Sequence, residues 1–104
     1  MRIEIDRGIR VFVDVDGMGW VPGPDGLVER PTVLFLHGGP GLDHSGFKLA
    51  LAELRDVAQL VMYDHRGQGR SDPCPPAQWG LDTLADDVVR LCAVLGIERP
   101  IVFG

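Results

Sequence analysis

The sequence has little of what marks several protein classes. Only two of its 104 residues are cysteines, Cys74 and Cys92, too few for a disulfide framework or a four-cysteine zinc site. It has no run of Lys or Arg, and 15 acidic residues outnumber 10 basic ones, so nucleic acid is not an expected partner. No tract is of low complexity, and 45% of the residues are hydrophobic, which is typical of a globular domain. We expect neither a metal nor a cofactor.

The N-terminus also lacks a long hydrophobic run. Residues 1–7 alternate apolar with charged side chains, whereas a signal peptide or a membrane span needs a continuous apolar stretch. We therefore expect a cytoplasmic protein that has no membrane partner.

Alternation of apolar and polar residues continues over residues 3–15. This period of two predicts two strands, and Arg7-Gly8 between them predicts a tight turn, so the chain is expected to open with an antiparallel hairpin. Residues 16–31 are rich in glycine and proline, which predicts a long exposed loop.

Three short apolar runs occupy residues 32–36, 59–63 and 100–104. Continuous apolar runs of this length predict strands that are buried on both faces, as in a parallel sheet. Apolar residues at helical spacing predict amphipathic helices between these strands, over residues 44–56 and residues 80–95.

The expected helices have end signals as well. Asp43 is suited to cap the first helix, and Gly96 is suited to end the second. The predicted fold class is α/β, with an antiparallel N-terminal hairpin followed by a parallel βαβαβ unit with right-handed crossovers.

Two glycine-rich segments follow the first two buried strands. The first is His37–Gly41, HGGPG, and the second is Asp64–Ser71, DHRGQGRS. Both are expected at the carboxyl ends of parallel strands, where α/β sheets bind ligands. Glycine lets a backbone N–H approach a ligand that a Cβ would exclude, so the first loop is suited to donate an amide to an oxyanion.

These two segments, together with Pro100–Gly104, resemble the proline iminopeptidase branch of the α/β-hydrolase fold family. The resemblance implies that the backbone N–H of Gly39 is one donor of the oxyanion hole. It further implies substrate contacts from the neighbouring loop residues, which are His37, Gly38, Pro40 and Gly41. In the second segment it implies residues that shape the loop, which are Asp64, Arg66, Gly67, Gly69 and Ser71.

In that family the third buried strand continues as V-x-G-x-S-x-G, where a strained turn exposes the nucleophilic serine. Residues 1–104 reach only the first glycine of this pattern, Gly104. The resemblance therefore implies that they form the N-terminal part of a single catalytic domain, before the nucleophile, the acid and the catalytic histidine. These residues alone are expected to be inactive, because an oxyanion donor needs an activated nucleophile beside it.

The predicted function is that of a serine hydrolase whose intact form cleaves an amide or ester, with N-terminal proline of a short peptide as the favoured substrate. A lactone or ester hydrolase and an epoxide hydrolase share the same sheet and are the alternatives within the fold. A different class of alternative is a non-catalytic remnant or a docking half, which would need a separate chain to supply the rest of the domain.

Two other interpretations of the loops fit the residues less well. Gly69–Pro73 imitates a nucleophile turn around Ser71, but proline stands where the last glycine is required. A dinucleotide-binding loop would place Gly or Ala at His44 or Asp72, and neither position fits.

The remaining polar residues are expected to have structural roles. His37 could be a general base, but a role in shaping the loop is favoured, and His44 and His65 are expected to face solvent. The acidic cluster on the second helix is expected to be a solvated face with favourable charge near the helix N-terminus; its members are Asp82, Asp86 and Asp87.

Overall fold

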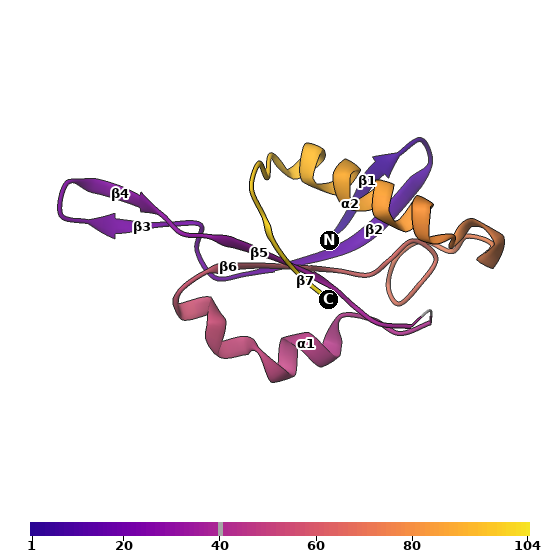
Figure 1. Cartoon of the computed structure of the whole chain (residues 1–104), viewed down its shortest axis with the longest axis horizontal. Helices are drawn as coiled ribbons and strands as arrows, with labels where there is room; N and C mark the ends of the chain where they lie inside the picture. Colours follow the sequence, from indigo (N-terminus) through magenta and orange to yellow (C-terminus); the bar gives the residue numbers. More distant parts are fainter. Residues whose placement is uncertain (40) are drawn as a thin grey trace.

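The computed structural model describes residues 1–39 and 41–104. Five strands form one sheet in the order β1-β2-β6-β5-β7, and β3 and β4 form a separate two-stranded sheet (Figure 1). The strands are β1 (Arg2–Asp6), β2 (Ile9–Asp16), β3 (Trp20–Gly23), β4 (Gly26–Glu29), β5 (Thr32–Leu36), β6 (Gln59–Tyr63) and β7 (Ile101–Phe103). The helices are α1 (Ser45–Ala50), η1 (Ala52–Asp56), η2 (Pro76–Gln78) and α2 (Leu81–Leu95).

The N-terminal hairpin is confirmed. β1 and β2 pair antiparallel, and Gly8 in the turn between them has a φ of +71°. Val11 and Val13 of β2 are buried, whereas Val15 is partly exposed where β2 nears its end. The alternation of the sequence thus places one face of this hairpin against the core.

The parallel part of the sheet is confirmed as well. β6 and β7 lie on either side of β5, and both pair with it in parallel, with Leu34 opposite both Val61 and Val102. β2 pairs antiparallel with β6 and places Val13 opposite Tyr63. The sheet is therefore mixed, as the sequence predicted.

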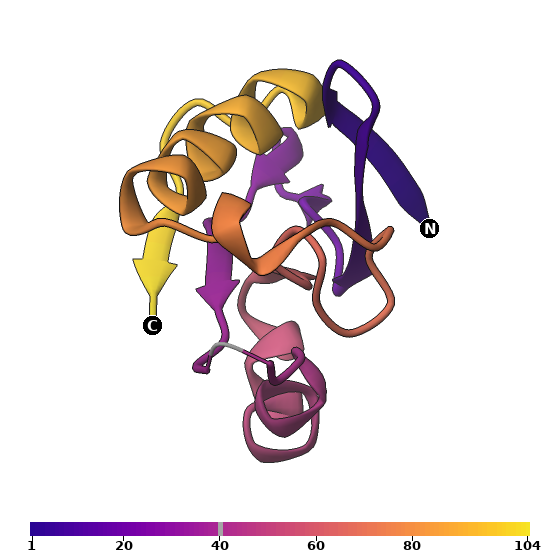
Figure 2. The ribbon, with the colours of Figure 1, turned by 90° about the vertical axis from the view of Figure 1, so that its right-hand side faces the viewer.

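Helices cover both faces of this sheet. α2 lies on one face, and α1 lies on the other (Figures 1 and 2). The core on the α2 face includes Ile5, Val11, Val13, Leu34, Val61, Tyr63 and Leu91. The core on the α1 face is formed by Phe35, Ala58, Leu60 and Met62, against which Phe47 and Leu51 pack. Two apolar layers of this kind are what a sheet covered on both faces requires.

The long loop predicted over residues 16–31 is wrong, because these residues contain the β3–β4 hairpin. Trp20 pairs with Glu29 and Gly23 with Gly26, and the hairpin projects from one end of the molecule (Figure 1). Gly26 has a φ of +122°. Glycine and proline therefore mark a tight turn between two short strands here, and not an unstructured segment.

The helix predicted over residues 44–56 is correct only in part. α1 ends at Ala50, Leu51 leaves the helical conformation with a φ of −120°, and η1 continues as a 3₁₀ helix. Apolar residues three and four apart fit 3.0 and 3.6 residues per turn about equally over so short a segment. Asp43 accepts a hydrogen bond from the Ser45 N–H at 2.9 Å, although His44 is the residue at the cap position.

The second predicted helix is confirmed as α2, and Gly96 ends it in the left-handed conformation with a φ of +70°. No helix in the described parts of the chain is long and apolar enough to cross a membrane. Since β5 and β6 are parallel neighbours, the loops that follow them leave the same edge of the sheet.

Matched substitutions on α2 test the position of the core. Leu91 is fully buried, while Val89 is 70% exposed on the same helix. We expect Leu91→Ala to lower the free energy of unfolding by about 2–5 kcal/mol, and Val89→Ala to change it by roughly 0.5 kcal/mol or less. Urea denaturation of the two variants of the whole protein measures both, and equal effects would contradict this packing.

Candidate active site

The glycine loop after β5 has a backbone that only glycine adopts easily. Gly39 has a φ of +128°, and a Cβ built on it would lie 2.9 Å from the backbone nitrogen of Gly41. A side chain at Gly39 would therefore meet both an unfavourable dihedral angle and a steric clash. Gly38, Gly39 and Gly41 are exposed at the edge of the sheet; Pro40 lies outside the described residues.

A side chain from the second loop holds the first. The Oε1 atom of Gln68 accepts a hydrogen bond from the Gly41 N–H at 2.9 Å, and Gln68 itself is only 3% exposed. No local sequence pattern indicates a role for Gln68, because the contact joins residues 27 positions apart. The two glycine-rich segments thus form one connected site.

His37 is buried, and both of its ring nitrogens face backbone groups. Its Nε2 accepts a hydrogen bond from the His65 N–H at 3.0 Å, so its proton resides on Nδ1, which lies 2.7 Å from the Gly38 carbonyl oxygen. These contacts tie the start of the glycine loop to the loop after β6. No carboxylate within the described residues orients His37 as a general base would need.

The expectation that His65 faces solvent is wrong. Its side chain is buried against His37, with ring centroids 4.3 Å apart, and its Nε2 lies 3.2 Å from the His37 carbonyl oxygen. Burial, and then the neighbouring His37, hold the pKa of His65 below its ordinary value. His65 lies inside because both its backbone N–H and its ring contact His37 of the neighbouring loop.

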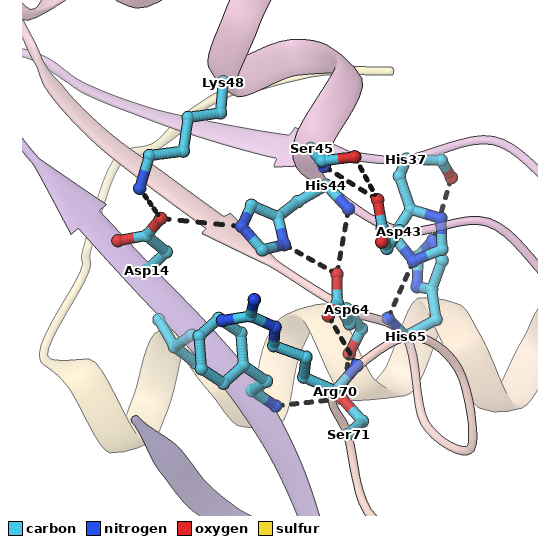
Figure 3. Close-up of polar contacts among 12 residues, drawn as sticks. Asp14, His37, Asp43, His44, Ser45, Lys48, Asp64, His65, Arg70 and Ser71 are labelled. Carbon is cyan, nitrogen blue, oxygen red and sulfur yellow. Dashed lines mark hydrogen bonds and ion pairs between the residues drawn. The ribbon is translucent and has the colours of Figure 1, made fainter.

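Asp64 is the centre of the second loop (Figure 3). Its carboxylate is completely buried, and it accepts hydrogen bonds from the backbone N–H groups of His44 and Arg70, both at 2.9 Å. Gly69 has a φ of +52° and packs against this carboxylate, where a Cβ would collide. Glycine at this position allows the loop to wrap around Asp64.

His44 is also buried, which corrects the second expectation of solvent exposure. Its Nδ1 lies 2.8 Å from the Asp64 carboxylate, and its Nε2 lies 3.5 Å from that of Asp14 on β2. Its ring stacks on Phe12, with centroids 5.6 Å apart. Lys48 pairs with Asp14 from the outer side (Figure 3), and its hydrogen bond is the largest cause that lowers the pKa of Asp14.

The expectation of a fully solvated acidic face on α2 fails at Asp87. This residue is 1% exposed, and both of its carboxylate oxygens accept hydrogen bonds from Arg66, at 2.7 and 2.6 Å. Asp82 and Asp86 are exposed as expected. The bidentate pair ties the loop after β6 to α2, and helical periodicity cannot reveal it, because an Asp beside the apolar stripe looks like a surface residue.

Ser71 is buried, and its hydroxyl is committed on both sides. It donates to the Asp64 carbonyl oxygen at 2.6 Å and accepts from the Phe12 N–H at 2.9 Å. A nucleophilic serine needs an exposed Oγ and an adjacent base. These contacts do not support the interpretation of Ser71 as a nucleophile.

An open hollow of about 410 Å³ adjoins the glycine loop, and its lining includes Gly41, Asp43, Ser45 and Gly69. A wider hollow of about 850 Å³ lies where β5 and β6 begin, and its lining includes Thr32 and Gln59. Sheets of this kind bind ligands at the carboxyl ends of their strands. The hollow beside the glycine loop is therefore the better candidate for the ligand-binding site.

The mixed sheet and the glycine loop at the end of the parallel strand β5 are the features of the α/β hydrolase class. The chain belongs to the alpha/beta hydrolase fold family, whose model matches residues 31–104. This membership excludes the dinucleotide-binding interpretation of the glycine loop.

Similar proteins include several peptidases. The chain is 35% identical to the proline iminopeptidase of Lacticaseibacillus rhamnosus, over 98% of this chain and 35% of that protein. It is 34% identical to the proline iminopeptidase of Clostridium botulinum, over 73% of this chain and 26% of that protein. A protein of Agrobacterium fabrum that is provisionally named as the carbamate hydrolase RutD is 35% identical, over 68% of this chain and 27% of its own length. The chain therefore spans between about a quarter and a third of the length of these relatives.

Among solved structures, a proline iminopeptidase-related protein of Thermus thermophilus superposes with a TM-score of 0.81 and 27% identity, over 96% of this chain and 33% of that one. An esterase of Exiguobacterium antarcticum superposes with a TM-score of 0.77 at 23% identity, over 99% of this chain and 34% of that one. The second likeness shows the shared fold alone.

The buried ion pair makes a testable contribution to stability. We expect Asp87→Asn to lower the free energy of unfolding by about 3–5 kcal/mol, because it leaves the buried Arg66 guanidinium without its charged partner. Asp86→Asn makes the same chemical change at an exposed neighbour and is expected to cost roughly 0.5 kcal/mol or less. Chemical denaturation of both variants is the measurement, and similar losses would contradict a special role for Asp87.

The buried His65 predicts a pH dependence. Because its pKa is lowered in the folded protein, the unfolded chain binds the proton more tightly, and stability should fall as the pH drops below the ordinary histidine pKa of about 6.5. An NMR titration of the His65 ring is expected to give a midpoint below about 6.5. A midpoint at or above that value would contradict the burial of a neutral ring.

Proposed function

We propose that the intact protein is a serine hydrolase that releases proline from the N-terminus of short peptides. In this proposal the backbone N–H of Gly39 is one of two donors of the oxyanion hole. The exposed backbone of Gly38 and Gly41 forms part of the adjoining wall of the substrate site. No cofactor takes part, since acyl transfer by an activated serine needs only a base, an acid and oxyanion donors.

The observation that carries the proposal is the glycine loop itself. It follows the parallel strand β5 at the carboxyl edge of the sheet, and Gly39 there has a φ of +128° on an exposed backbone. Backbone N–H groups held in advance at such a place stabilise the negative oxygen of a tetrahedral intermediate. The names of two relatives, both proline iminopeptidases, support the choice of substrate.

The nucleophile is proposed to lie outside these 104 residues, on the turn that follows β7. This strand pairs with β5 on one side, and its residues Ile101, Val102 and Phe103 are about half exposed. An apolar parallel strand of this kind is normally covered and extended by further structure. The remainder of the domain, in the same polypeptide or as a separate chain, is proposed to cover it.

A substrate panel tests the proposed specificity. The intact protein is assayed with proline arylamide, other aminoacyl arylamides, a short-chain ester, a lactone and an epoxide. The proposal predicts that kcat/KM is highest for proline arylamide. Preference for the ester or the lactone would replace the substrate class while keeping acyl transfer. Preference for the epoxide would replace the reaction as well, because an epoxide has no carbonyl group to form a tetrahedral intermediate. Absence of turnover on every substrate would favour a non-catalytic protein instead.

A substitution in the glycine loop tests the oxyanion donor. Gly39→Ala is expected to lower kcat by about 10²- to 10³-fold with a smaller change in KM, because the donor acts mainly on the transition state. Gly80→Ala is the matched control, since a Cβ there meets nothing within 4 Å and this glycine lies before α2. Equal activities of the two variants would contradict the role of Gly39.

A further inference from the structure

His44 lies where three separate segments of the chain meet. His44 lies just before α1, and its ring stacks on Phe12 of β2. The two ring nitrogens face the carboxylates of two other segments. Nδ1 faces Asp64 in the loop after β6 at 2.8 Å, and Nε2 faces Asp14 on β2 at 3.5 Å (Figure 3). A buried imidazole held on both sides has one orientation available to it.

His44 makes two hydrogen bonds to Asp64. The same oxygen, Oδ1, receives both the backbone N–H of His44 at 2.9 Å and the ring nitrogen Nδ1 at 2.8 Å. The other oxygen of Asp64 receives the Arg70 N–H. Within the described residues, the His44 ring provides a side-chain N–H donor to this fully buried carboxylate. Hydrogen bonds from such donors offset the free-energy cost of burying a carboxylate.

The glycine loop ends at this bond. Only Leu42 and Asp43 separate Gly41 from His44, and Gly41 is itself held by Gln68. The chain beyond Gly39 is thus tied twice to the loop after β6, once at Gly41 and once at His44. Both ties are made to side chains of that loop, Gln68 and Asp64.

We propose that His44 is a positioning residue that fixes the glycine loop, and with it the Gly39 donor, through the bond between its Nδ1 and Asp64. This inference rests on the proposed function of Gly39. His44 does not touch the substrate. It acts through the placement of backbone donors, which must be held within a fraction of an ångström for full effect.

Two substitutions of His44 by neutral amide side chains, which differ in length by one methylene, test the bond between His44 and Asp64. His44→Asn places an amide nitrogen near the position of Nδ1 and keeps a donor for Asp64, whereas His44→Gln extends past Asp64 toward Asp14. We expect His44→Gln to lower kcat by about 10- to 100-fold with KM nearly unchanged, and His44→Asn to retain most of kcat. Both variants lack the imidazole, so a general effect of losing it would appear in both.

Lys48→Met is the control for the outer side of this cluster, since it removes the exposed partner of Asp14 and leaves the His44–Asp64 bond in place. It is expected to leave kcat and KM unchanged. Hydrogen exchange of the backbone amides over residues 37–44 gives a readout that does not depend on turnover. Exchange of the Gly41 amide, which is bonded to Gln68, should become faster in His44→Gln than in His44→Asn.

The outcomes separate this inference from the proposed function. Turnover by the native protein together with equal kcat and equal exchange in the Asn and Gln variants would overturn the role of His44 and leave the hydrolase proposal standing. Absence of turnover in the native protein would contradict the proposed function, and the exchange data would then decide alone whether His44 fixes the loop. A fall in kcat accompanied by an equal loss of folded protein in both variants would also overturn the inference, because it would show a structural role only.

Discussion

The arrangement around the candidate site depends on one buried carboxylate. Asp64 follows β6, has no exposed surface, and accepts hydrogen bonds from the backbone of His44 and of Arg70 and from the His44 ring. A carboxylate without such partners would cost several kcal/mol to bury, roughly, and would not remain charged. Because its donors come from two different loops, satisfying this one group also brings the loops together. The glycine at position 69 is required for the same reason, since a side chain there would occupy the space of the carboxylate.

Further polar contacts attach this centre to its surroundings. Arg66 joins the loop to α2 through Asp87, Ser71 joins it to Phe12 of β2, and Gln68 joins it to Gly41. Each contact satisfies a buried donor or acceptor that would otherwise be costly. These contacts fix the loop after β6 at several points, and this loop in turn holds Gly41 and His44 beside it.

The sequence predicted the architecture well and the side-chain contacts poorly. Alternation over β1 and β2 and continuous apolar runs over β5 and β6 reflect which faces of a strand are buried, so they are visible without coordinates. The β3–β4 hairpin was missed because glycine and proline mark both loops and tight hairpin turns. His44, His65 and Asp87 were expected at the surface because their types are usually exposed, and nothing near them in sequence names the partners that bury them.

The sequence by itself determined the order of the strands of the main sheet and of α1 and α2, the glycine loop after β5, and the family to which that loop points. Those features are local, because they follow from the spacing of apolar residues and from the steric freedom of glycine. Only the tertiary structure decided which polar groups are buried and which side chains join the glycine loop to the loop after β6. Those contacts join residues 20 or more positions apart, such as His44 with Asp64 and Arg66 with Asp87, and they exist only once the sheet has brought its carboxyl ends to one edge.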